Sequence, residues 1–134
     1  MTNEGKIAWI AGILEGEGCF ILDEKNKACN PRIQLQMTDY DVVKQFKDFS
    51  LELIRAKSTV KITDMPGTNK KVYRFMLNSS NAIKLMKLIL PYMGERRSNR
   101  INEIVRKRKN YENIFGPGNK WVIRYCGQIM VGNN

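Results

Sequence analysis

Apolar and polar residues alternate most clearly over residues 31–38 of the chain. Ile33, Leu35 and Met37 take every second position, and the positions between them carry Arg32, Gln34, Gln36 and Thr38. Strict alternation is typical of a β-strand with one face buried and one face in water. The pattern therefore predicts a half-buried strand whose wet face carries long hydrogen-bonding side chains.

Three more segments have the composition of strands, and four have that of helices. Strands are predicted over 19–24, 58–65 and 70–77, and residues 66–69 (Pro-Gly-Thr-Asn) between the last two are typical of a hairpin turn. Helices are predicted over 6–16, 40–54, 80–90 and 98–112. The first of these helices is apolar around most of its surface, which indicates burial on several sides. Pro91 ends or kinks the third helix.

The order of these elements, αββαββα, predicts an α+β domain. Two hairpins, each followed by a helix, favour a four-stranded antiparallel sheet with helices on one face. The other face would expose a row of polar side chains, namely Arg32, Gln34, Gln36, Lys61 and Arg74. We expect residues 1–134 to form a single domain, with its core over about 6–112. Residues 113–134 form a Gly- and Asn-rich C-terminal extension, with a short strand expected at 121–123.

The charge of the chain is large and unevenly distributed. The formal net charge is +10, from 23 Lys and Arg and 13 Asp and Glu residues. Residues 1–53 carry six basic and nine acidic residues, whereas residues 54–134 carry 17 basic and four acidic ones. A domain this basic indicates a polyanionic partner, most often nucleic acid. The alternative is a basic surface that is merely solvated.

The composition restricts the chemistry open to the chain. It has no histidine, which excludes Ser-His-Asp and Cys-His hydrolases, His-based nucleases and the usual zinc enzymes. Hydrolysis would have to use carboxylates, a bound metal, Lys or Arg, and water. Three cysteines without a C-x-x-C pair favour a reducing, intracellular setting over a disulfide framework or a zinc site. No apolar run approaches the ~20 residues of a membrane span, and we expect no signal peptide.

One segment stands apart from these patterns. Residues 10–18 read Ile-Ala-Gly-Ile-Leu-Glu-Gly-Glu-Gly, so an apolar helix ends in two acids that alternate with glycine. Gly12 and Gly16 share one helix face and would let another backbone approach closely, either within one subunit or between two. Glu15 and Glu17 oppose the helix macrodipole, at a cost of about a few tenths of a kcal/mol. The segment is suited to bringing a carboxylate to an interface.

This segment resembles the LAGLIDADG signature of homing endonucleases. With Ile allowed for Leu and Glu for Asp, all nine positions agree in type, and the αββαββα order over about residues 6–112 is also that of the family. The resemblance implies a saddle-shaped sheet on double-stranded DNA, with both strands cut across the minor groove in a Mg²⁺-dependent hydrolysis. Mn²⁺ or Ca²⁺ are expected to substitute for Mg²⁺ in binding. A single motif implies a homodimer on a long, partly palindromic site.

The resemblance also implies roles for residues of the motif. Glu17, the last acid, would bind the metal, and the carbonyl of Gly16 is a further candidate ligand. Gly12 and Gly16 would pack against the same helix of a second subunit. Glu15 is expected to cap a helix at the interface rather than to bind the metal.

Residues outside the motif complete the expected site. Arg96 and Arg97 lie where family members carry a basic residue that reaches the scissile phosphate, and the choice between them stays open. Asp39 lies where many members carry a Gln that organises water, and its alternative role is to cap its own helix. The polar row would read base edges in the major groove, with a solvated sheet face as the alternative: Arg32, Gln34, Gln36, Lys61 and Arg74. The basic run 106–109 is expected to contact phosphates or to be a solvated helix end.

These features favour a homodimeric, Mg²⁺-dependent, site-specific DNA endonuclease. Phosphodiester hydrolysis needs an activated water and neutralisation of charge, and a divalent metal bound by carboxylates supplies both. One alternative is a non-catalytic relative on the same fold, either an RNA-binding maturase or a DNA-binding regulator. Another is a plain basic RNA-binding module. Glu17 together with the Arg96–Arg97 pair favours the nuclease.

Overall fold

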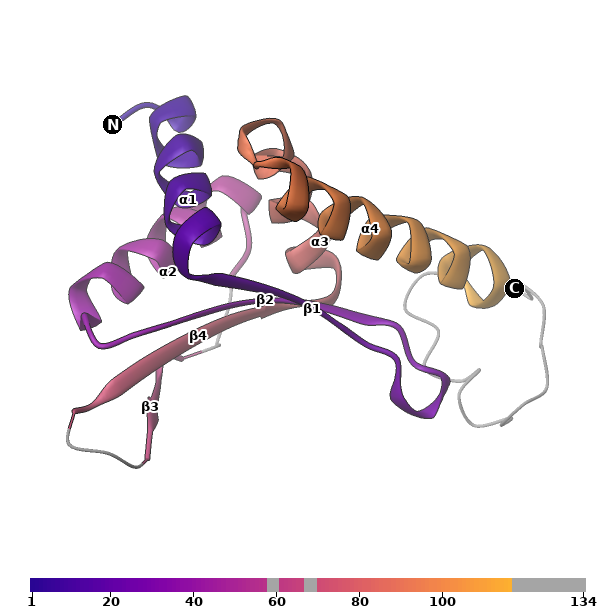
Figure 1. The fold of residues 1–134 in the computed structure, drawn as a ribbon, viewed down its shortest axis with the longest axis horizontal. Coiled ribbons are helices and arrows are strands. Elements are labelled where there is room, and N and C mark those ends of the chain that lie inside the picture. Colours follow the sequence, from indigo (N-terminus) through magenta and orange to yellow (C-terminus); the bar gives the residue numbers. More distant parts are fainter. Residues whose placement is uncertain (58–60, 67–69, 117–134) are drawn as a thin grey trace.

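The chain follows the predicted order of helices and hairpins (Figure 1). The computed structural model describes residues 1–57, 61–66 and 70–116. Two short 3₁₀ turns, Lys25–Lys27 and Leu90–Tyr92, join its main elements. These are α1 (Asn3–Glu17), β1 (Gly18–Asp23), β2 (Asn30–Met37), α2 (Tyr40–Ile54), β3 (Thr63–Met65), β4 (Val72–Asn78), α3 (Ser79–Ile89) and α4 (Glu95–Phe115).

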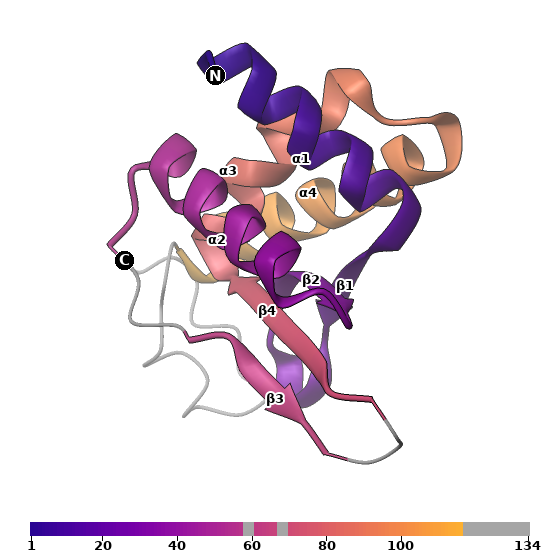
Figure 2. The same ribbon diagram turned by 90° about the vertical axis from the view of Figure 1, so that its left-hand side faces the viewer.

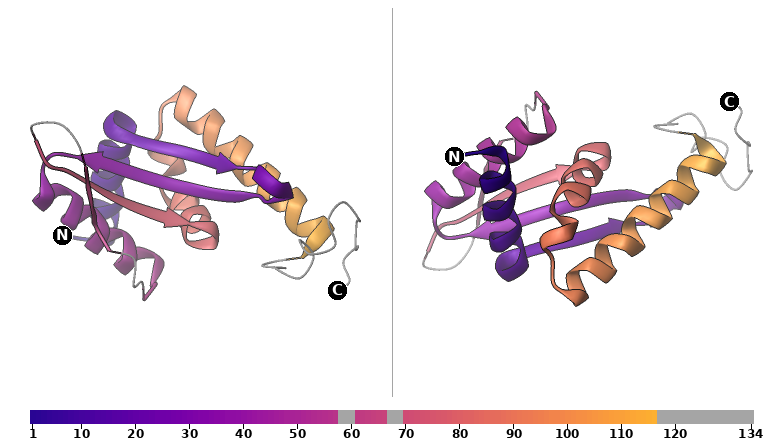
Figure 3. Two further views of the ribbon diagram at one scale, coloured as in Figure 1. Left: turned by 90° about the horizontal axis from the view of Figure 1, so that it is seen from below. Right: turned by 90° about the horizontal axis from the view of Figure 1, so that it is seen from above.

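The strands of the described residues form one antiparallel sheet in the order β1-β2-β4-β3. The two hairpins meet along β2 and β4, where Ile33 pairs with Leu77 and Leu35 with Phe75. All four of these side chains are buried under the helices. The helices lie on one side of the sheet, and the opposite face carries none of them (Figures 1 and 3). The predicted α+β class with a four-stranded antiparallel sheet is confirmed.

The hydrophobic core fills the space between the sheet and the helices. Figure 2 shows α1 and α2 side by side above the sheet. The helices contribute one set of fully buried side chains: Ile10, Leu14, Val43, Phe46, Leu85, Met86, Ile89, Ile101 and Ile104. Phe46 and Phe75 pack edge to face across the interface between α2 and the sheet, with ring centroids 6.1 Å apart. Burial of each such side chain stabilises the fold by roughly 1.5–3 kcal/mol.

Most predicted boundaries differ from the observed ones by a few residues; α1, for example, begins at Asn3 rather than at residue 6. The strand predicted over 58–65 begins only at Thr63; Lys61 precedes it, and 58–60 lie outside the described residues. β3 pairs with β4 alone, over three residues. The helix predicted over 98–112 begins at Glu95, because the extended backbone of Gly94 forms its N-cap, and it ends at Phe115.

Two further predictions lie wholly or partly outside the described residues. These are the strand expected at 121–123 and most of the hairpin turn at 66–69. In the part of the chain that is described, no helix combines the length and the apolar character that crossing a membrane requires.

The C-terminal end of α2 generates a prediction about stability. Arg55 has φ 53° and ψ 45°, a left-handed conformation that side chains disfavour, and the following amide of Ala56 donates to the carbonyl of Leu51 at 3.0 Å. We expect Arg55→Gly to raise the free energy of unfolding by about 1 kcal/mol, measured by urea denaturation. Lys57→Gly is the control, because Lys57 does not have a positive φ. A glycine at position 57 loses more backbone entropy on folding and relieves no strain. A lower stability of Arg55→Gly than of wild type would contradict the prediction.

Candidate functional site

The carboxylate of Glu17 lies where the first helix meets the sheet. Glu17 is the last residue of α1, and its side chain is exposed. An open pocket of about 380 Å³ adjoins it, lined by Glu17, Gln36, Met37, Thr38 and Val72. The pocket therefore brings together the end of α1, the end of β2 and the start of β4.

The sequence reaches this arrangement through a tight passage from helix to strand. The chain enters β1 at Gly18 without an intervening loop, and the amide of Gly18 still donates to the carbonyl of Leu14. A Cβ atom at position 18 would lie only 2.5 Å from Cδ2 and 2.8 Å from the carbonyl oxygen of Leu14. Only glycine fits this turn, so steric constraint explains why the motif ends in a glycine.

The other acid of the motif is engaged within the chain. Oε1 of Glu15 accepts a hydrogen bond from the backbone amide of Gly94 at 2.6 Å, and Oε2 lies 3.8 Å from Nε of Arg97. Because Gly94 is the N-cap of α4, the carboxylate also lies near the positive end of that helix dipole. Glu15 was expected to cap a helix rather than to bind the metal, and its carboxylate does accept from the N-cap amide of α4 of its own chain.

The two adjacent arginines at the start of α4 have different environments. Nη1 of Arg97 donates to the carbonyl oxygen of Gly18 at 2.6 Å, its guanidinium lies 5.6 Å from the ring centre of Phe20, and its side chain is only 12% exposed. Arg96 is exposed and has no hydrogen-bonding or ionic partner among the described residues. Arg96 is therefore the arginine of the pair that is available to an external phosphate.

Asp39 lies next to the pocket in sequence. It follows Thr38, is exposed and occupies the N-cap position of α2. Its backbone carbonyl accepts from Val43 at 3.2 Å, but its side chain makes no capping hydrogen bond. Asp39 therefore occupies the N-cap position, as expected for its alternative role, but caps the helix through its backbone only, and its side chain is exposed.

The uncovered sheet face carries most of the predicted polar row. Cross-strand pairing places Arg32 between Ile21 and Asn78, and Gln34 between Cys19 and Met76. Gln36 and Arg74 pair directly, and Thr63 pairs with Arg74 on its other side. This face is seen in the left panel of Figure 3.

The observed pairing of β3 with β4 changes which residues belong to this polar row. Lys61 is exposed but precedes β3, so Thr63 rather than Lys61 continues the row beyond Arg74. Sequence reasoning also missed the neighbours of the predicted residues on this face: Cys19, Ile21, Met76 and Asn78. Their alternation within single strands was visible, but only the pairing of strands places them beside the glutamines. One salt bridge lies on this face, between Arg32 and Asp23 at 3.4 Å.

The first two of the three motif glycines face solvent. Gly12 and Gly16 are exposed, and a Cβ atom at either position would meet nothing within 4 Å. The alternative that these glycines serve close packing inside one subunit is therefore wrong for the described residues. They belong to an uncovered face of α1 that also includes the exposed Ala8.

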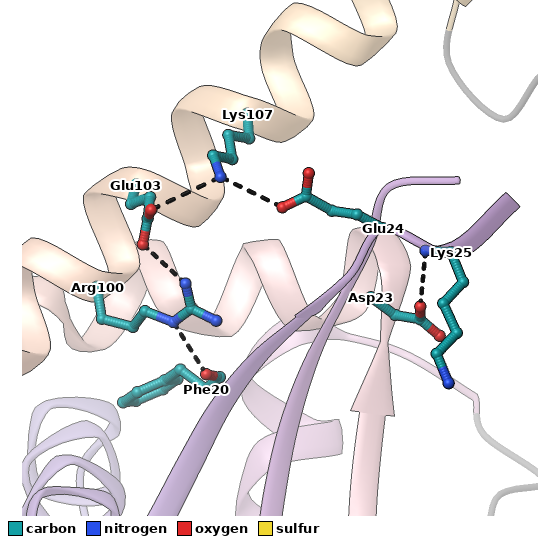
Figure 4. A network of polar contacts seen from close by, with 7 residues as sticks. All are labelled: Phe20, Asp23, Glu24, Lys25, Arg100, Glu103 and Lys107. Carbon is teal, nitrogen blue, oxygen red and sulfur yellow. Dashed lines mark hydrogen bonds and ion pairs between the residues drawn. The ribbon is translucent and has the colours of Figure 1, made fainter. Parts of the chain in front are cut away.

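Many of the basic side chains of α4 hold that helix on the β1-β2 hairpin (Figure 4). Arg100 donates to the carbonyl of Phe20 at 3.2 Å and to Glu103 at 2.7 Å, and Lys107 donates to Glu24 at 3.2 Å. The hydrogen bond from Arg100 holds the pKa of the Glu103 carboxyl below its ordinary value.

Further along α4, Arg108 is buried and acts on the same hairpin. Its Nη1 donates to the carbonyl of Cys29 at 2.6 Å. Burial raises the pKa of the Cys29 thiol, so this cysteine stays protonated and unreactive. The expectation of a solvated or phosphate-binding run at 106–109 is therefore wrong for Arg108. Lys107 is partly exposed in its surface ion pairs, and Arg106 and Lys109 are exposed.

Within the described residues, no group of three or more His, Cys, Asp or Glu side chains is placed to hold a metal ion. Glu17 is the carboxylate that lines the pocket, and Gly16 precedes it in the last turn of α1, where helical carbonyls lack amide partners. A single subunit thus offers a small set of oxygen donors at this place.

Solved structures of DNA-bound homing endonucleases share this arrangement of elements. The homing endonuclease I-CvuI, in complex with the I-CreI target and 2 mM Mg with the DNA not cleaved, matches 90% of this chain and 83% of its own, with a TM-score of 0.52 and 12% identity. I-CvuI with its own target and 2 mM Ca matches 92% and 93%, with a TM-score of 0.52 and 14% identity. The chain has the LAGLIDADG homing endonuclease fold.

The LAGLIDADG meganuclease I-AabMI, bound to uncleaved DNA, has this fold as well. The match has a TM-score of 0.58 and 18% identity, and it covers 80% of this chain but only 37% of I-AabMI. In sequence alone, no family model matches the chain, and no curated protein matches it significantly. The LAGLIDADG fold thus emerges from the structure and the motif, and not from overall sequence similarity.

The engaged and exposed arginines of α4 generate a second prediction. Arg108→Met keeps an aliphatic stem but removes the donor to the buried carbonyl of Cys29, so we expect the free energy of unfolding to fall by about 1–3 kcal/mol. The same change at the exposed Arg106 is the control and should stay within ~0.5 kcal/mol of wild type. Thermal and urea denaturation measure both. Equal losses in the two variants would contradict the structural role of Arg108.

Proposed function

We propose that the protein is a site-specific double-stranded DNA endonuclease of the LAGLIDADG family that acts as a homodimer. The observation that carries this proposal is the position of Glu17. Its exposed carboxylate lies at the junction of an uncovered helix face and an uncovered polar sheet face. A catalytic acid at that junction can meet both a second subunit and a bound duplex.

The sheet face suits DNA in its chemistry. Arginine side chains can donate two hydrogen bonds to guanine, and glutamine can both donate to and accept from adenine. Arg74 and Gln36 are paired neighbours on this face, and Gln34 follows on β2. The net charge of +10 adds a sequence-independent attraction to phosphates. The related I-CvuI and I-AabMI structures contain DNA, which supports this choice of partner over RNA.

The helix face suits a second copy of the chain. A helix whose outward positions are small residues allows the backbone of another helix to approach closely. On α1 these positions are Ala8, Gly12 and Gly16, and no described residue of the same chain covers them. Two α1 helices packed through this face would bring two Glu17 carboxylates together at the two-fold axis.

The donors near the pocket fit Mg²⁺. This ion prefers oxygen ligands and is usually bound by one or two carboxylates together with waters and phosphate oxygens. Glu17 and the carbonyl of Gly16 would hold it, with Mn²⁺ or Ca²⁺ as substitutes in binding. A bound divalent ion supplies an activated water and neutralises the charge that develops on the phosphate. Asp39 would orient the attacking water, and Arg96 would contact the scissile phosphate.

A cleavage selection tests the reaction directly. The protein is incubated with Mg²⁺ and a library of randomised double-stranded DNA, and cut sites are recovered. Glu17→Gln should abolish cleavage of the recovered site and leave its DNA affinity nearly unchanged, because the amide removes a metal-binding charge and keeps the shape. Glu4→Gln, the same change in the first turn of α1, is the control and should cleave normally.

Cleavage retained by Glu17→Gln would refute the role of this residue as metal ligand. Recovery of no cut site from the library would favour a non-catalytic relative, either an RNA-binding maturase or a DNA-binding regulator.

The dimer is tested by a leucine on the uncovered face of α1. Gly12→Leu should leave the subunit folded, because its Cβ meets nothing within 4 Å and Gly disfavours a helix by about 1 kcal/mol relative to Ala. It should shift the protein from dimer to monomer in sedimentation velocity, since the added side chain separates the two helices. Lys87→Leu adds the same side chain at an exposed position of α3 and should remain dimeric. A dimeric Gly12→Leu variant of wild-type affinity would refute this interface.

A further inference from the structure

The short segment that carries Glu17 is fixed on both sides by one side chain of α4. Arg97 donates to the carbonyl of Gly18 at 2.6 Å, one residue after Glu17, and lies 3.8 Å from Glu15, two residues before it. Its side chain is 12% exposed, whereas the Glu15 side chain is 40% exposed. The mostly buried side chain of Arg97 thus joins the end of α1 to the start of β1.

A second contact from α4 completes this connection. The backbone amide of Gly94 donates to Oε1 of Glu15 at 2.6 Å. A Cβ atom at position 94 would lie 3.2 Å from the same oxygen, so a glycine there leaves room for the Glu15 carboxylate. Arg97 also lies over the ring of Phe20, which is buried in the core. The connection is therefore anchored in the rigid part of the fold.

Glu17 itself has no comparable anchor. Its side chain is exposed and has no partner among the described residues, so its direction depends on the backbone of residues 15–18. That backbone is the last turn of a helix, where carbonyl groups have no amide partner within the helix and helix ends commonly fray. The positive charge of Arg97 near the C-terminus of α1 interacts favourably with the helix dipole, whereas Glu15 and Glu17 in the last turn interact unfavourably with it.

We propose that Arg97 is a positioning residue that sets the direction of the Glu17 carboxylate and does not contact the phosphate. This proposal rests on the proposed function, in which Glu17 binds the metal. Groups that orient metal ligands commonly change metal affinity or activity by about 10–100-fold when they are removed. Arg97 would act in this way through the backbone of Gly18 and the carboxylate of Glu15.

The experiment compares Arg97→Gln with Arg96→Gln, which removes the same charge from the neighbouring residue. Mn²⁺ is titrated into the folded protein without DNA, and the paramagnetic broadening of the Gly16 and Gly18 amide signals gives its affinity. Arg97→Gln should weaken Mn²⁺ binding by about tenfold, and Arg96→Gln should leave it unchanged. Glu17→Gln should remove the broadening and so show that the signal reports this site.

Cleavage of the selected DNA site gives a second readout. Arg97→Gln should need about tenfold more Mg²⁺ for its half-maximal rate at unchanged DNA affinity. Arg96→Gln should lower the maximal rate without changing the Mg²⁺ requirement. Arg97→Lys, which keeps the charge beside Glu15 but not the planar fork, should lie between wild type and Arg97→Gln. It also replaces Arg97→Gln in both measurements if that variant does not fold.

The outcomes separate this inference from the proposed function. Wild-type Mn²⁺ affinity in folded Arg97→Gln or Arg97→Lys would overturn the positioning role, whether or not the protein cleaves DNA. A reduced maximal rate of Arg97→Gln with an unchanged metal requirement would place Arg97 at the phosphate and would also overturn it. Weakened Mn²⁺ binding in a protein that cuts no DNA would support the positioning role and refute only the nuclease.

Discussion

The architecture depends on the passage from α1 into β1 without a loop. Gly18 belongs to both elements. Its amide donates to the carbonyl of Leu14 in the last turn of the helix, and Gly18 also pairs with Leu35 in the sheet. The direction of α1 is therefore coupled to that of the sheet, and Ile10 and Leu14 anchor the helix in the core. The last side chain of the helix then emerges at the level of the uncovered sheet face. No flexible connection lies between the framework and the candidate acid.

Positive charge has two different tasks in this molecule, and hydrogen bonding to backbone carbonyls separates them. The guanidiniums of Arg97, Arg100 and Arg108 donate to the carbonyls of Gly18, Phe20 and Cys29, respectively, along the β1-β2 hairpin. These contacts compensate for the narrow apolar stripe of α4, where Ile101 and Ile104 supply the fully buried apolar side chains. The net charge thus overstates the positive charge that is available to the proposed DNA partner, because part of it is hydrogen-bonded within the fold.

Much of the fold could be predicted from local patterns, and the site only in part. The alternation in β2 and the span of α2 are local properties, so strand and helix were found where the structure has them. Strand register depends on contacts between segments far apart in the sequence, which is why Thr63 was missed beside Arg74. Arg96 and Arg97 are equivalent in sequence, and only the tertiary contacts of Arg97 distinguish them.

In the proposed homodimer, the uncovered face of α1 would separate the folding of each subunit from the pairing of the two. Since a side chain at position 12 or 16 would meet nothing in its own subunit, residues on that face can change without a penalty inside the monomer. Two copies of the gene could acquire complementary substitutions on this face. A larger side chain in one product, opposite a smaller or oppositely charged one in the other, would make the two products pair with each other rather than with themselves. Such a pair would carry two different sheet faces side by side and would recognise a DNA sequence without two-fold symmetry.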